Sequence, residues 1–239
     1  MTLPEFFGCT FIAFGPPFAL FVFTIANDPV RIIILIAAAF FWLLSLLLSS
    51  LLWFAIIPLR DVLAFGVFFS VVFQECFRYI IYRILRSTEQ GLQAVAEDTR
   101  VTDNKHILSY VSGLGFGIIS GMFAVVNVLA DMSGPGTMGL KSGTELFFVT
   151  SAAQALSIIL LHTFWSVIFF NACDTNNYLH IAYVIGSHLF VSLLTLLNAS
   201  ELYTATLLTN YIITILTGLL AFRVAGGTSR SFKKFVTCQ

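Results

Sequence analysis

Residues 113–129 read GLGFGIISGMFAVVNVL, and this stretch decides the fold more than any other. It carries no charged residue, and glycines recur every four residues at Gly113, Gly117 and Gly121. Each glycine costs about 1 kcal/mol relative to alanine inside a helix, which makes the pattern poor for a helix in water. In a membrane, small residues let two helix backbones approach closely. We therefore expect a membrane-spanning helix with a flat glycine face.

The glycine face has two interpretations. It packs against another helix of its own chain, or it forms a groove that receives a helix of a partner chain. Close packing across small residues serves either purpose. The pattern alone does not choose between them.

The composition of the whole chain indicates an all-α, polytopic membrane protein. Of its 239 residues, 58% are hydrophobic and only 10% are charged, and the mean hydropathy is +0.94. Soluble domains carry about 25% charged residues. The formal net charge is zero, so no basic surface indicates a nucleic-acid partner. Its scattered cysteines predict neither a zinc site nor a disulfide framework.

Windows of about 20 mostly apolar residues are long enough to cross a bilayer. Seven such windows occur, and we expect them to form a single seven-helix membrane domain over residues 1–239. The predicted spans are 5–26, 32–57, 62–85, 109–130, 146–171, 178–197 and 206–225.

The positions of Lys and Arg predict the orientation, because cytosolic loops are enriched in both. Ten basic residues, Arg78 among them, fall on the side of the C-terminus, against only Arg60 and Lys141 on the other side. We therefore expect a lumenal or extracellular N-terminus and a cytosolic C-terminus. The sequence Asn198-Ala199-Ser200 is a glycosylation motif on the lumenal side. It lies so near the membrane that we expect Asn198 to stay unmodified.

Ionisable side chains inside spans are costly and mark candidate functional sites. The third span carries Gln74, Glu75 and Arg78, the fifth carries His162 and the sixth carries His188. Because a helix rises 1.5 Å per residue, Glu75 and both histidines lie about 14–15 Å from the cytosolic ends of their helices. If these side chains face inward, they form one buried polar cluster in which Arg78 pairs with Glu75.

Such a cluster has three interpretations. The groups satisfy one another and fix the helix register, they line a cavity for water, lipid or a partner segment, or they form a proton relay or catalytic centre. The second interpretation carries an alternative function, a channel or transporter built around Glu75, His162 and His188. No metal-binding motif such as HExxH is present. An aspartyl protease needs two carboxylates in one site, and Glu75 is the only acid at depth.

Several long strings resemble the anterior pharynx-defective family, the seven-span subunits of gamma-secretase. They are FFGCTFIAFGPPFALFVFTIANDP at 6–29, AFFWLLSLLLSSLLWF at 39–54, QECFR at 74–78, YVSGLGFGIISG at 110–121, ILLHTFW at 159–165 and AGGTSRS at 225–231. The resemblance covers nearly the whole chain. The connection between the second and third spans is shorter than in vertebrate members.

The resemblance implies a non-catalytic scaffold subunit without a cofactor. In this family the subunit assembles with nicastrin, with presenilin, which supplies the catalytic aspartates, and with presenilin enhancer. The complex cleaves single-span proteins such as Notch and amyloid precursor protein, and so acts in the Notch signaling pathway. Its implied locations are the endoplasmic reticulum, the Golgi and the plasma membrane.

The resemblance also implies roles for particular residues. The glycines of the family's repeated GxxxG motif, which assembly requires, match Gly113, Gly117 and Gly121. Two intramembrane histidines implicated in presenilin association and activity match His162 and His188. Residues expected to line a polar cavity of the family match Gln74, Glu75 and Arg78.

Overall fold

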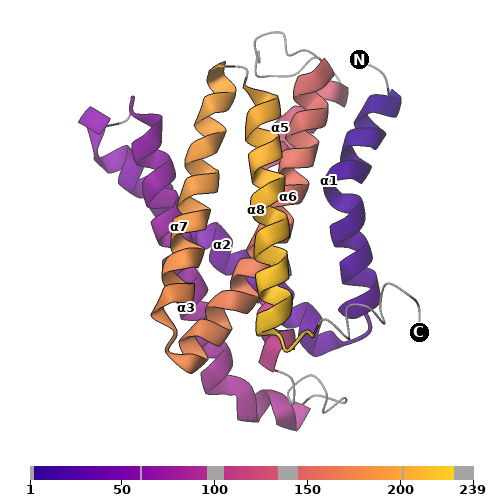
Figure 1. The fold of residues 1–239 in the computed structure, drawn as a ribbon, viewed down its shortest axis with the longest axis vertical. Helices are drawn as coiled ribbons and strands as arrows, with labels where there is room; N and C mark the ends of the chain where they lie inside the picture. Colours follow the sequence, from indigo (N-terminus) through magenta and orange to yellow (C-terminus); the bar gives the residue numbers. More distant parts are fainter. Residues whose placement is uncertain (1–2, 60, 96–104, 134–144, 201, 229–239) are drawn as a thin grey trace.

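The computed structural model describes residues 3–59, 61–95, 105–133, 145–200 and 202–228. These residues form helices, and seven of the helices are long and apolar enough to cross a membrane, which confirms the predicted fold class (Figure 1). The elements are α1 (Leu3–Thr24), α2 (Pro29–Ala55), η1 (Ile57–Leu59), α3 (Leu63–Val95), α5 (Lys105–Ser133), α6 (Glu145–Thr175), α7 (Tyr178–Leu194), η2 (Thr195–Ser200) and α8 (Tyr203–Val224).

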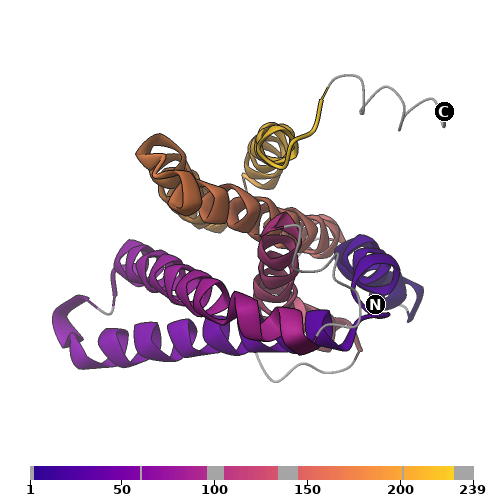
Figure 2. The ribbon, with the colours of Figure 1, turned by 90° about the horizontal axis from the view of Figure 1, so that it is seen from below.

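Helices α5 and α6 form the centre of the bundle. Buried residues make up 61% of the apolar window of α5 and 67% of that of α6, against 17–28% for the other spans. Helix α6 packs against α1, α5, α7 and α8, while α5 also packs against α2, which in turn packs against α3. The view along the helices in Figure 2 shows α5 between α2 and α6. The glycine-rich helix is therefore an internal element.

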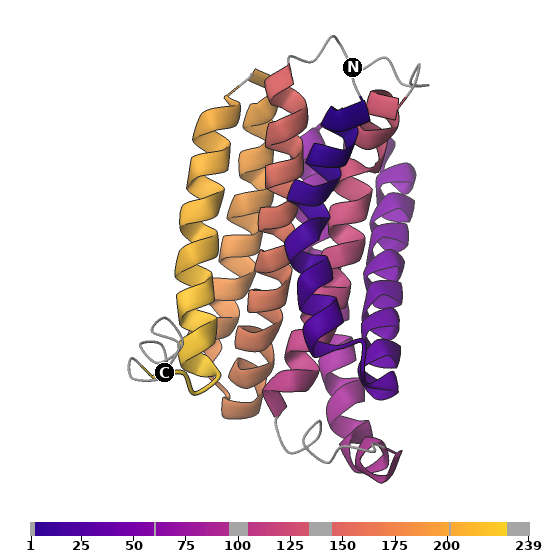
Figure 3. The same ribbon diagram turned by 90° about the vertical axis from the view of Figure 1, so that its right-hand side faces the viewer.

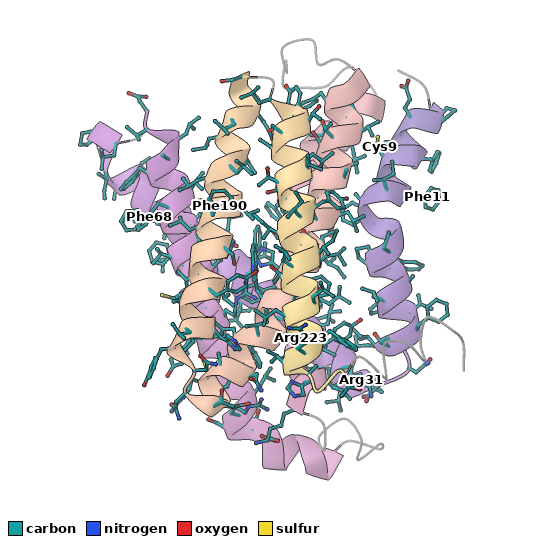
Figure 4. All side chains as sticks on the ribbon, in the orientation of Figure 1. Cys9, Phe11, Arg31, Phe68, Phe190 and Arg223 are labelled. Carbon is teal, nitrogen blue, oxygen red and sulfur yellow. The ribbon has the colours of Figure 1, made fainter. Side chains whose placement is uncertain are left out.

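The remaining helices surround this centre and expose apolar side chains on their outer faces. In Figure 3 the helices lie side by side with their long axes roughly aligned, as spans of one bilayer would. Phe11, Phe68 and Phe190 project outward from different helices in Figure 4. Apolar side chains all around the outer surface suit contact with lipid tails.

Two turns show why helices begin where they do. Asp28 is the N-cap of α2, because its Oδ1 accepts a hydrogen bond from the Val30 amide at 2.9 Å, and Pro29 occupies the first helical turn. Asn176 adopts a left-handed conformation with φ of 54° between α6 and α7, and the next residue, Asn177, caps α7 by accepting from the His180 amide. Both turns are short, but among the described residues only the second joins two helices that pack on each other, α6 and α7, since α1 packs on α5 and α6.

Some helices run further than the apolar windows indicated. Helix α3 ends at Val95 rather than near residue 85, and α5 begins at Lys105 rather than near residue 109. Beyond residue 85, Arg86 bonds to Asp174 on α6 and pairs with Glu89 on α3 itself. The apolar window marks where a helix leaves the membrane, and polar helix-forming residues continue the helix beyond that level.

Candidate functional site: a buried ion-pair network beside a glycine-packed helix pair

The glycine face of α5 lies against the backbone of α6. A Cβ atom added at Gly117 would lie 2.5 Å from the carbonyl oxygen of Ile159 and 3.0 Å from its Cα. A Cβ added at Gly113 would lie 2.7 Å from the Cβ of Ser166. At Gly121 the nearest atom is a movable side-chain carbon of Ile159. The structure favours packing within the chain, because α6 occupies the face that a partner helix would need.

A second close approach lies on the opposite side of α5. A Cβ at Gly115 would overlap the carbonyl oxygen of Leu35 and would lie 3.2 Å from the Cβ of Ala38 on α2. Gly115 lies outside the four-residue glycine repeat, so the sequence pattern did not predict this contact. Glycines on two faces let α5 approach both α2 and α6 closely, which brings α3 and α7 around the same centre.

Arg78 and Glu75 form a buried ion pair on α3. The Nε of Arg78 lies 3.1 Å from Oε2 of Glu75, and its Nη2 lies 3.2 Å from Oε1. Arg78 is completely buried and Glu75 is 5% exposed. Opposite charges this close offset part of the large cost of removing each from water.

The guanidinium of Arg78 also reaches across to α6. Its Nη2 lies 2.9 Å from Nδ1 of His162, and its Nη1 donates to the His162 carbonyl oxygen at 3.2 Å and to Oγ of Ser166. An arginine has five N–H groups and accepts no hydrogen bonds. Together with the two bonds to Glu75, all five have acceptors. Nδ1 of His162 therefore carries no proton, and its ring proton is on Nε2.

His188 brings α7 into the same network. Its Nδ1 lies 2.6 Å from Oε1 of Glu75. Because the ionised carboxylate only accepts, Nδ1 of His188 is the donor. Its ring stacks on Trp165 with the ring centres 4.5 Å apart, and Nε1 of Trp165 donates to Oγ of Ser187 at 2.9 Å. The network thus links α3, α6 and α7.

Gln74 belongs to a separate hydrogen-bonded group of three residues. Its Oε1 accepts from Nε1 of Trp42 on α2 at 3.1 Å, and its Nε2 donates to Oγ of Ser70. Gln74 also lines a cavity of about 390 Å³ between α2, α3, α6, α7 and η2, together with Ser49 and Ser192. Among the described residues that line this cavity, none is Glu75, His162 or His188.

The structure therefore brings four of the five polar candidates into one network and places Gln74 beside it. The remaining candidate, Asn198, lies in η2, where its Oδ1 accepts from Oγ1 of Thr206 at 2.7 Å. Its lack of glycosylation stays a prediction. Ser166 and Trp165 were missed, although Ser166 lies four residues after His162 and thus on the same helix face.

The four ionisable side chains of the network bind one another and Ser166. Within the described ranges, no three His, Cys, Asp or Glu side chains are grouped as a metal site requires. Arg78 also donates to Nδ1 of His162, so this ring nitrogen is not available to a metal. The fold and site together define a seven-helix membrane protein whose core is held by glycine packing and an interhelical ion-pair network.

Comparison with known proteins places this seven-helix chain in a family. The family described as Aph-1 protein matches residues 4–228 of this chain, and the chain belongs to this family. It is 88% identical over 239 residues to the gamma-secretase subunit Aph-1 of Drosophila melanogaster, with both chains covered completely. It is 48% identical to the gamma-secretase subunit Aph-1b of Danio rerio, covering all of this chain and 95% of that protein.

A more distant relative is similar over most of the chain as well. The gamma-secretase subunit aph-1 of Caenorhabditis elegans is 29% identical over 94% of this chain and 82% of its own length. The family identified by these comparisons is the one that the sequence strings resembled.

Proposed function

We propose that this chain is the non-catalytic scaffold subunit of a gamma-secretase complex. Its 88% identity to the Drosophila subunit over the full length carries this proposal. The geometry supports a structural role, because three N–H groups of Arg78 bind His162 and Ser166 on α6 and the other two bind Glu75 on α3 itself. Among the described residues Glu75 is the only buried carboxylate, while an aspartyl protease requires two.

The proposal includes the partners expected from the family resemblance. The chain assembles with nicastrin, presenilin and presenilin enhancer, presenilin supplies the catalytic aspartates, and the complex cleaves single-span proteins such as Notch and amyloid precursor protein. The chain forms a single membrane domain with a lumenal N-terminus. It resides in the endoplasmic reticulum, the Golgi and the plasma membrane.

Two roles for individual residues belong to this proposal. The glycines Gly113, Gly117 and Gly121 act in assembly indirectly, by fixing the shape of the helix pair that partners meet. The network of Glu75, Arg78, His162 and His188 supports presenilin association by holding α3, α6 and α7 in one register. The contacts of these residues within the chain support this indirect mode.

Co-purification from cells tests the proposal. The tagged full-length chain is extracted in mild detergent, and its partners are quantified by mass spectrometry. We expect nicastrin and presenilin in near-stoichiometric amounts. We expect Arg78→Met to lose most of this recovery, whereas Arg83→Met, the same change at an exposed position of α3, keeps it. Recovery of the wild-type chain without these partners would overturn the proposal.

The cavity beside Gln74 favours a second candidate, a channel or transporter. Serine and glutamine side chains line it at one end of the bundle. The described part of the cavity does not include the buried network, so a solute would still have to pass Arg78 and Glu75. Purified protein in liposomes tests this function: an ion or solute flux that falls in His188→Ala supports it, and flux equal to that of empty vesicles excludes it.

A further inference from the structure

The inner face of α8 carries buried polar residues, and one of them bonds to α6. Thr206, Asn210, Thr214 and Thr217 recur every three or four residues, and all are at most 5% exposed. Oγ1 of Thr214 lies 2.8 Å from Oγ of Ser157 on α6. This α6–α8 contact is therefore a polar seam between two helices, some distance along α6 from the Arg78 network.

Two side-chain amides in this seam have unused hydrogen-bonding groups. Asn210 is completely buried, and neither its Oδ1 nor its Nδ2 has a hydrogen-bond partner among the described residues. Nε2 of Gln154 on α6 is also buried without a partner in the described part of the chain. Buried polar groups in proteins are nearly always paired with protein or with ordered water. These amides therefore point to a ligand.

The register of the seam places the two amides at one level. Tyr211 on α8 donates from its hydroxyl to the Ala153 carbonyl oxygen at 3.0 Å. Asn210 precedes Tyr211 in sequence, and Gln154 follows Ala153. Thr206, one turn before Asn210, lies on the same face of α8.

A pocket of about 260 Å³ lies beside the seam; Gln154 is among its described lining residues and Asn210 is not. Gln154 and Thr206 both line it, with Thr150, Ser151 and Asn198 supplying further polar groups and Ile158 an apolar wall. Its described lining includes no Asp, Glu, Lys or Arg. Such a lining suits a neutral ligand, and at about 30 Å³ per molecule the volume holds several waters.

We propose that this seam pocket binds an uncharged ligand through a hydroxyl group, either ordered water or the hydroxyl of a neutral lipid, with Gln154 as the binding residue on its wall. The ligand also reaches the unpaired amide of Asn210, one turn beyond the lining residue Thr206. A hydroxyl both donates and accepts, and the carboxamide of Asn210 offers both complements. The site shares no residue with the Glu75–Arg78 network. A failure of the proposed scaffold function would therefore leave this site unaffected, and the reverse also holds.

Electron cryo-microscopy of the full-length chain in lipid nanodiscs, at a resolution that shows ordered water, tests this site. We expect density within hydrogen-bond distance of the Asn210 amide in the wild type and its loss in Asn210→Leu. Thr209→Leu, a neighbouring change at a residue whose hydroxyl donates to the Ala205 carbonyl oxygen within α8, should keep the density. Round density identifies water, whereas elongated density that continues to the bilayer identifies a lipid.

A second measurement covers the case in which Asn210→Leu does not fold. Gln154→Met removes the other unpaired amide and should also weaken the density. For the lipid source, a photoreactive monoacylglycerol should label peptides of α6 and α8, with about a tenfold drop in Gln154→Met, the effect of losing one hydrogen bond. A wild-type protein with neither density at Asn210 nor labelling would overturn the site.

Discussion

At the scale of residues, Arg78 and Glu75 depend on each other, because each is a charge buried away from water. Removing one partner of a buried pair leaves the other uncompensated, which costs about 3–5 kcal/mol. We expect Arg78→Met to lower the stability of the purified chain by about this amount, measured by thermal unfolding in detergent with circular dichroism.

A matched control separates the pair from the general effect of replacing an arginine. Arg83 lies on the same helix and is exposed, so Arg83→Met should unfold within a few degrees of the wild type. Adding Glu75→Gln to Arg78→Met should recover part of the loss, because it removes the unpaired charge. If Arg78→Met and Arg83→Met were equally stable, the buried ion pair would not stabilise the fold.

His162 makes a separate prediction, because its Nδ1 acts as an acceptor for Arg78. Asparagine can place an acceptor oxygen near that position, whereas leucine cannot. We expect His162→Leu to be less stable than His162→Asn by about 1–3 kcal/mol, the cost of leaving a buried donor unpaired. Thermal unfolding of the two purified variants measures the difference, and the opposite order would show that Nδ1 is not the required atom.

At the scale of elements, the spacing of α5 and α6 is set by Gly117. An alanine there would place its Cβ 2.5 Å from a backbone oxygen of Ile159, which cannot rotate away. The two helices would have to separate, and overpacking of this kind costs about 1–3 kcal/mol. We expect Gly117→Ala to lower the unfolding temperature and to reduce recovery of partner subunits.

Gly186 on α7 provides the control for this substitution. A Cβ at Gly186 would meet nothing within 4 Å, and alanine is a better helix former than glycine by about 1 kcal/mol. Gly186→Ala should therefore match or exceed the wild type in stability. If Gly117→Ala behaves in the same way as Gly186→Ala, the glycine face does not control the packing.

The sequence allowed the spans and the levels of Glu75, His162 and His188 to be predicted, because helical rise converts residue counts into depth. Rotation about each helix axis was harder to predict. Helix α6 carries apolar residues on all sides, as a helix at the centre of a bundle does. Only His162 and Ser166, four residues apart, indicate the face that meets α3. Nothing in the sequence predicts that Trp165 stacks on His188.

Other parts of the site depend on pairs of helices that one sequence does not reveal. The four-residue spacing identified Gly113, Gly117 and Gly121, but only the position of α2 explains Gly115. Similarly, Gln74 follows Ser70 by one turn, yet its bond to Trp42 depends on how α2 crosses α3.

At the scale of the whole molecule, the distribution of Lys and Arg predicts the orientation in the membrane. Arg78 was counted among the cytosolic basic residues, but the structure places it completely buried. Without Arg78, nine basic residues remain on the side of the C-terminus against two on the other side, so the predicted orientation is unchanged. Arg31 and Arg223 lie toward the same end of the bundle in Figure 4, and we expect that end to face the cytosol.

Glycosylation tags measure this orientation directly. A short acceptor sequence added before the first helix should be glycosylated in cells, and the same sequence added after the last residue should not. The reverse pattern would contradict the lumenal placement of the N-terminus.

Rescue of proteolysis in cells tests whether the buried network is required for the scaffold function. Drosophila cells lacking their own Aph-1 subunit would receive this chain, its Arg78→Met variant or its Arg83→Met variant at equal expression, and Notch cleavage would be measured. We predict that the wild type and Arg83→Met restore cleavage and that Arg78→Met loses most of it. Cleavage unchanged in Arg78→Met, or absent with the wild-type chain, would contradict a scaffold held together by the buried network.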